Sequence, residues 1–146
     1  MNATDARTTL LAQHDQIRRQ LEVCTGLARQ HRSGHVVTVR LDAALAELRE
    51  LLARHNQVET TIIGNLLHGP AAWGSLLVDR MLEEHVAEHA VFWEHLSGTH
   101  AEIAARIDDL VEELEAHMAA EERTFLSPVT LREDVIRTRT REAPSE

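Results

Sequence analysis

Hydrophobic residues recur at intervals of three and four positions along four stretches of the chain, and none of these stretches shows the sustained alternation of a strand. The stretches cover about residues 6–30, 37–67, 75–96 and 100–126. Gly and Pro residues separate them, at Gly34, Gly69-Pro70 and Gly98. Because short connections make consecutive helices antiparallel neighbours, the pattern predicts an all-α fold, an up-down-up-down antiparallel four-helix bundle.

The helical stretches end before a polar terminus. We expect residues 1–128 to form the bundle, with Thr99 and Glu102 making a capping box at the start of the fourth helix. Ser127-Pro128 should end that helix, because proline cannot continue it. Residues 129–146 are predicted to be a C-terminal extension, partly helical at first and then flexible.

Composition and charge exclude several classes of protein. The chain has 146 residues, of which 43% are hydrophobic and 27% charged, as expected for one globular domain. A net charge of −9 argues against nucleic-acid binding. No apolar run approaches the roughly 20 residues that span a membrane, and the N-terminus lacks the features of a signal peptide. With Cys24 as its single cysteine, the chain is expected to be cytoplasmic, without a membrane partner.

Five of the ten histidines follow a leucine or valine by three positions. This spacing places a side chain on the same face of a helix as that apolar residue, and therefore toward the core. An isolated imidazole there would be costly. The five are His14, His55, His85, His89 and His117. The other histidines lie at or near turns, except His95, which is about 80° away from the core-facing stripe of its helix.

Two carboxylates obey the same rule. Glu59 is four residues after His55 and Glu121 is four residues after His117, so each should point inward beside its histidine. Glu122 lies a further 100° round its helix and Glu88 sits at the border of its stripe. We expect both to be solvated, with orientation of a metal-binding side chain as the alternative.

Counting residues between each group and the nearest turn places the groups at similar levels along the bundle. About 20 residues separate His14 from the first turn, and about 21 lead from there to His55. The third connection fits worse, since about 9 residues precede the turn after His89 and about 19 follow it before His117. Either the third helix continues past Gly98 or the chain there is more extended.

Five imidazoles and two carboxylates at one level predict a metal centre, because buried charged groups are paired or bind metal. Seven donors exceed the needs of one ion but suit two ions bridged by carboxylates. A set of nitrogen and oxygen donors without a thiolate favours iron over manganese or zinc. The Glu-x-x-His motif of ferritin-like di-iron bundles is absent from these positions, so the centre is of a different kind.

The chain resembles the hemerythrin-like, or HHE cation-binding, domains over about residues 9–128. The resemblance rests on a lone His14, His55-x3-Glu59, His85-x3-His89, and His117-x3-Glu121 before the sequence TFLSP. It implies that His14 and His55 hold one iron and the other three histidines a second. The two carboxylates would bridge the irons together with an oxo or hydroxo group, and one iron would keep an open position for a small ligand.

Two details modify this resemblance. Oxygen-carrying hemerythrins typically place their last carboxylate, an aspartate, five residues after the histidine, whereas here Glu121 and Glu122 occupy the fourth and fifth positions. Either could bridge, and we favour Glu121. The pair His85 and His89 is closer to the five-histidine, oxygen-binding kind than to domains with one histidine in this helix; a supporting role outside the metal's ligands is the alternative for His89.

The resemblance implies a non-haem di-iron protein that binds dioxygen, or a similar diatomic ligand such as NO, for storage, transport or sensing. A ligand-binding protein fits histidine-rich ligation better than a dedicated enzyme does, and the absence of tyrosine excludes a tyrosyl radical. Three alternatives stay open: a di-iron enzyme acting on peroxide or nitric oxide, an iron storage or sensing protein with a labile centre, and a metal-free helical interaction module.

Overall fold

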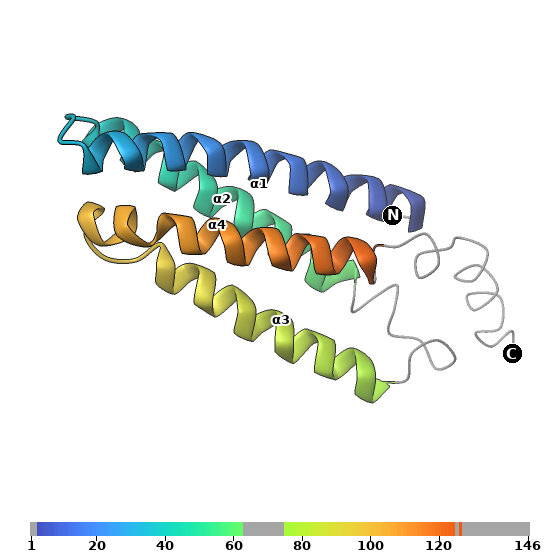
Figure 1. Cartoon of the computed structure of the whole chain (residues 1–146). Coiled ribbons are helices and arrows are strands. Elements are labelled where there is room, and N and C mark those ends of the chain that lie inside the picture. The colour runs from blue at the N-terminus through green and yellow to red at the C-terminus, as the bar shows by residue number, and fades with distance from the viewer. Residues whose placement is uncertain (1–2, 63–74, 125, 127–146) are drawn as a thin grey trace, which may run out of the picture.

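The computed structural model describes residues 3–62, 75–124 and 126, and over these residues the fold is an all-α four-helix bundle (Figure 1). The helices are α1 (Ala3–Arg32), α2 (Thr38–Ile62), α3 (Ser75–His95) and α4 (His100–Arg123). Consecutive helices run in opposite directions, as the sequence predicted. The expected helical residues 63–67, the Gly69-Pro70 break, the stop at Ser127-Pro128, the boundary at 128 and the extension 129–146 lie outside the described residues.

The buried stripes of α2 and α4 change from apolar to polar toward their C-terminal ends, and this change locates the site. The buried residues of α2 are spaced by three or four; they begin with leucines and end in His55, Glu59 and Ile62. The stripe of α4 likewise passes from isoleucine and leucine to His117 and Glu121. Each buried leucine stabilises the fold by about 1.5–3 kcal/mol. The aliphatic part holds the helices together and fixes the level of the polar part.

The packing partners differ among the helices. Helix α1 packs against both α2 and α4, while α3 packs mainly against α4. The core between them is almost wholly aliphatic. Its largest fully buried side chains are Leu10, Ile17, Leu21, Leu41, Leu45, Leu48, Leu52, Leu96, Ile107, Leu110 and Leu114. Over the residues that the structure describes, no helix is both long enough and apolar enough to cross a membrane.

The start of α4 confirms the predicted capping box. The hydroxyl of Thr99 accepts a hydrogen bond from the backbone N–H of Glu102, whose side chain in turn accepts one from the backbone of Thr99. Gly98 precedes this cap with φ +106°, a conformation that residues with a Cβ rarely adopt. At its other end α4 stops at Arg123, three residues earlier than predicted.

The connection between α3 and α4 explains the mismatch in the residue count. Helix α3 ends at His95, so it does not continue past Gly98. The chain instead runs lengthwise along the bundle, so that α4 begins beyond the end of α3 (Figure 1). Side chains also lean toward the N-terminus of their helix, which moves those of two antiparallel helices toward a common level. The rings of His89 and His117 therefore meet, with centroids 5.2 Å apart.

Candidate metal centre

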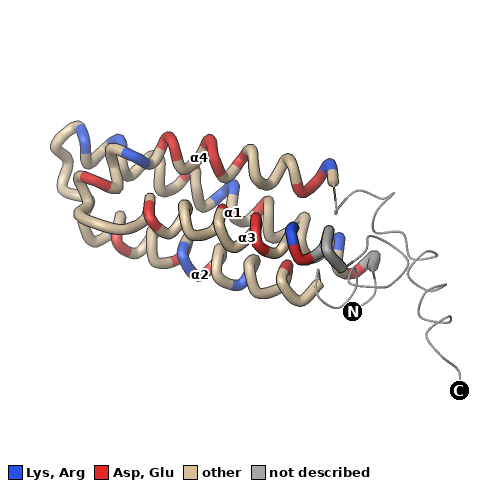
Figure 2. Tube along the Cα trace, turned by 90° about the horizontal axis from the view of Figure 1, so that it is seen from below, with Lys and Arg blue, Asp and Glu red and all other residues tan. Residues whose placement is uncertain are grey.

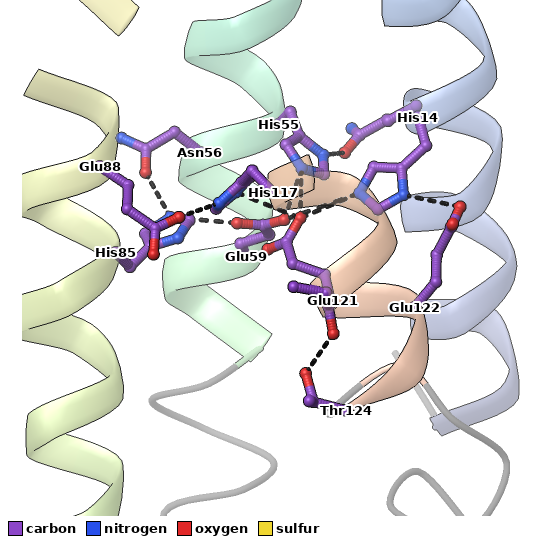
Figure 3. Close-up of polar contacts among 12 residues, drawn as sticks. His14, His55, Asn56, Glu59, His85, Glu88, His117, Glu121, Glu122 and Thr124 are labelled. Atoms are coloured by element: carbon purple, nitrogen blue, oxygen red, sulfur yellow. Dashed lines mark hydrogen bonds and ion pairs between the residues drawn. The ribbon is translucent and has the colours of Figure 1, made fainter. Parts of the chain in front are cut away.

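The seven residues singled out in the sequence converge in the interior of the bundle (Figure 3 shows most of them). None of the seven is more than 9% exposed. They come from all four helices and form two overlapping groups, in each of which one donor atom per residue lies within 4.8 Å of the others. The groups share Glu59; one is His14, His55, Glu59 and Glu121, and the other is Glu59, His85, His89 and His117.

The first group surrounds one oxygen of each carboxylate. Oε1 of Glu121 lies 3.0 Å from His14 Nε2 and 3.5 Å from His55 Nε2. Oε1 of Glu59 lies 4.0 Å from His14 Nε2 and is in close contact with His55 Nε2. Two imidazoles and two carboxylates therefore direct their donor atoms at a common point between α1, α2 and α4.

The second group uses the other oxygen of Glu59, whose Oε2 lies 3.1 Å from His85 Nε2. The rings of His85 and His89 have centroids 4.2 Å apart, and His117 completes the cluster at 5.8 Å and 5.2 Å from them. Oε1 of Glu121 is 3.3 Å from His117 Nε2, so this carboxylate also faces both groups. Glu59 and Glu121 thus lie between two sets of imidazoles.

Many of these buried donor atoms lack a hydrogen-bond partner. They are His55 Nε2, both oxygens of Glu59, both nitrogens of His89, His117 Nε2 and Glu121 Oε2. Leaving a buried polar group without a partner costs about 1–3 kcal/mol. Seven such atoms facing one another form an arrangement that two cations would satisfy, and the donor set of imidazole and carboxylate is one that iron accepts.

Glu122 and Glu88 each accept a hydrogen bond from a histidine of the cluster; Glu88 is solvated as expected, whereas Glu122 is only 30% exposed. His14 Nδ1 donates to Glu122 Oε1 over 3.2 Å, and both oxygens of Glu122 accept hydrogen bonds from the Arg18 guanidinium. His117 Nδ1 donates to Glu88 Oε2, although the Glu88 side chain is 51% exposed. Both contacts fit the expectation that these residues could orient a metal-binding side chain.

Two further supporting residues were missed in the sequence. Oε1 of Gln13 accepts a hydrogen bond of 2.9 Å from His55 Nδ1. Oδ1 of Asn56 accepts one of 2.7 Å from His85 Nε2. Both are amides placed directly beside a core-facing histidine in the sequence, a signal that could have found them. The Gln13 contact is on the ring nitrogen that faces away from the donor group, and such outer contacts fix the ring orientation of a histidine that binds metal. The Asn56 contact instead shares His85 Nε2 with Glu59 Oε2.

The histidines of the cluster differ in pKa according to how closely they contact the carboxylates. Burial alone would lower the pKa of His14, but Glu121 and Glu59 outweigh it and raise the pKa to about 9. Burial is likewise the largest single influence on His117, but Glu121, Glu59 and Glu88 together outweigh it and raise the pKa to about 9. Burial, reinforced by the positive charge of His85 and His117, lowers the pKa of His89 to about 3. Without metal, positive charge therefore collects beside Glu121, where a cation would replace it.

The remaining described histidines and the cysteine stay apart from this cluster. His95 donates to the carbonyl of Val91, and His100 contacts Asp42. His68 lies outside the described residues. Cys24 is fully buried in the aliphatic core, where burial raises the pKa of its thiol to about 11. Neither metal-binding group contains a thiolate.

A four-helix bundle with two buried groups of imidazole and carboxylate donors, drawn from every helix, defines a class of protein able to bind cations inside a helical scaffold. Comparison with protein-family models narrows this class. Residues 5–127 match the hemerythrin HHE cation binding domain, and the chain belongs to that family. No curated protein and no solved structure matches the chain.

Proposed function

We propose that this chain is a non-haem di-iron protein that binds dioxygen, or a similar small ligand such as NO, for storage, transport or sensing. The observation that carries the proposal is the pair of four-donor groups sharing Glu59. One ion would be held by His14, His55 and the two carboxylates, and the other by His85, His89 and His117 with Glu59. Membership of a cation-binding family supports this assignment.

The bridging role falls to Glu59 and Glu121. Each presents carboxylate oxygen to histidines of both groups, and together they account for three of the buried oxygens without a hydrogen-bond partner. Glu122 is less suited to bridging, because Arg18 and His14 already occupy its oxygens and its side chain is 30% exposed. This geometry supports Glu121 over Glu122 as the second bridge.

The surrounding residues favour ligand binding. Two irons would supply reversible one-electron chemistry, while the chain orients its imidazoles through outer acceptors and excludes water with apolar side chains. Leu114 and Ile62, one turn from His117 and Glu59, are at most 2% exposed. Phe92 packs edge-on against both His89 and His117. The described surroundings contain no tyrosine, because the chain has none.

The test is metal content and the visible spectrum of protein purified without chelator. We expect about two irons per chain, with near-ultraviolet bands that bleach on anaerobic reduction and return in air. The change of His117 to alanine should abolish these bands. The matched control is His95→Ala, since His95 is also a helical histidine but belongs to neither donor group. Circular dichroism would show that both variants stay helical.

Three outcomes would contradict the proposal. Protein that contains no iron, and takes up none on anaerobic addition of Fe(II), would leave only a helical bundle. Rapid turnover of peroxide or nitric oxide at the centre, with no reversible ligand complex, would assign it to a di-iron enzyme instead. Equal loss of the bands in the two histidine variants would show that the spectrum does not arise from the assigned residues.

A further inference from the structure

A pocket of about 360 Å³ lies between α3 and α4, beside the second donor group. Glu88, Val91 and Phe92 line it from α3, and Glu113, Ala116, His117 and Ala120 line it from α4. The two alanines, one turn apart, leave the space open. Six water molecules at about 30 Å³ each fill about 180 Å³, so the pocket has room for a hydrated divalent ion.

The charges around this pocket favour a cation. Two carboxylates line it and no Lys or Arg does; its one cationic side chain, His117, is paired with Glu88. Oε2 of Glu113 is enclosed and has no hydrogen-bond partner; the nearest recorded basic atom, His95 Nδ1, is 3.7 Å away. Residues 107–122 of α4 include seven acidic and no basic side chains apart from His117, and Figure 2 shows acidic positions along α3 and α4. A cleft in which one sign of charge is in excess concentrates ions of the other sign.

Phe92 and His117 are the two buried residues among those that line the pocket, and their ring centroids are 5.3 Å apart. Behind them lies His89, whose centroid is 5.2 Å from each, and both His89 nitrogens lack a hydrogen-bond partner. Unused donor atoms of the second group therefore lie next to the rings that line the pocket.

From this arrangement we infer that the α3–α4 pocket is the route by which a divalent cation reaches the centre, with Glu113 as its first protein contact. The inference rests on the proposed metal-binding function and adds the path by which the metal enters the protein. A second pocket, between α1 and α4, is a poorer route. Arg18 and Arg29 line it, and it includes none of the seven donor residues.

The experiment is stopped-flow uptake of Co(II), followed by its visible absorption, and of anaerobic Fe(II), by the metal-free full chain. Glu113→Gln should slow uptake about threefold or more at low ionic strength, and salt should reduce the difference from wild type. Ala116→Leu, which fills the pocket without changing charge, should also slow uptake. Neither change should alter metal affinity at equilibrium. The matched control is Glu112→Gln, an exposed carboxylate on α4 that does not line the pocket.

Unchanged uptake rates in both Glu113→Gln and Ala116→Leu would overturn the route. Equal slowing by the Glu112 control would reduce the effect to general surface charge and would overturn it too. If Ala116→Leu slowed azide binding to the metal-loaded protein but not metal uptake, the pocket would serve the small ligand instead. Failure of the wild-type chain to bind either metal at equilibrium would refute the proposed function itself, which separates the two claims.

Discussion

In the metal-free protein, His14 should make stability depend on pH. Its side chain is fully buried, and its two ring nitrogens donate to Glu122 and Glu121. These contacts raise its pKa from 6.5 to about 9 against the opposing effect of burial. A folded-state pKa above the unfolded value means that the stabilisation is complete below about pH 6.5 and is lost as pH rises through 9. At 1.36 kcal/mol per unit, the effect is on the order of 3 kcal/mol.

Urea unfolding of chelator-treated protein at several pH values between about 6.5 and 9 measures this effect. Wild type should lose stability as pH rises, with His117, whose pKa is also raised to about 9, adding to the loss. Because both histidines contact Glu121, their contributions should sum to less than twice one of them. His14→Gln should be less stable than wild type at pH 6.5 and approach it near pH 9.

The control is Gln16→Ala, at an exposed position of α1; because neither side chain titrates, its difference from wild type should stay constant with pH. Two other groups with shifted pKa values affect stability outside the range from pH 6.5 to 9. The pKa of His89 is lowered to about 3, so its effect falls below pH 6.5, and the pKa of the Cys24 thiol is raised to about 11, so its effect lies near and above pH 9. A gap between wild type and His14→Gln that stayed constant or widened with pH would refute the reasoning.

Three other changes test separate parts of the structure. Native Cys24 should react with a thiol reagent about 100-fold or more slowly than in urea, because burial raises its pKa from 9.0 to about 11; fast labelling of folded protein would contradict its burial. Thr99→Ala should cost about 1 kcal/mol in urea unfolding, by loss of the capping box, and Thr99→Ser much less. Glu122→Ala should weaken metal binding about 10–100-fold, as measured by competition with a chelator. Glu115→Ala should change it little, since both carboxylates contact Arg18 but only Glu122 reaches His14, and equal losses would contradict this.

The fold and the position of the candidate site could be predicted because one rule governs both. In α2 the spacing that buries Leu48 and Leu52 also buries His55 and Glu59, so hydrophobic periodicity locates polar residues of the interior as well. The level of α4 relative to α3 could not be predicted in the same way. Residue counts measure length along the chain, whereas the direction of the 96–99 connection decides where α4 begins in space.

The side-chain oxygens that accept hydrogen bonds from these histidines show a regularity that depends on the assembled bundle. Each helix supplies an oxygen to a histidine of the next helix in chain order, and α4 supplies one to α1, which closes a ring (Figure 3 shows contacts of this ring). The pairs are Gln13 with His55, Asn56 with His85, Glu88 with His117, and Glu122 with His14.

The offsets of these acceptors follow from antiparallel topology. In α1 and α3 the acceptor comes one residue before an inward-facing histidine, and in α2 and α4 one residue after an inward-facing histidine or glutamate. One residue turns 100° about a helix axis. Alternate helices run in opposite directions, so a one-residue step along the sequence turns clockwise in one helix and anticlockwise in the next when both are viewed from the same end of the bundle. An acceptor that faces the next helix in chain order therefore comes one residue before the inward-facing residue in one helix and one residue after it in the next. Sequence periodicity leaves the direction of chain order round the bundle undetermined, so it does not show which flanking polar residue meets which histidine. Once the direction of chain order round the bundle is known, the turn of 100° per residue assigns all four pairs of acceptor and histidine. One of these pairs, His85 with Asn56, also links α3, which packs mainly on α4, to α2.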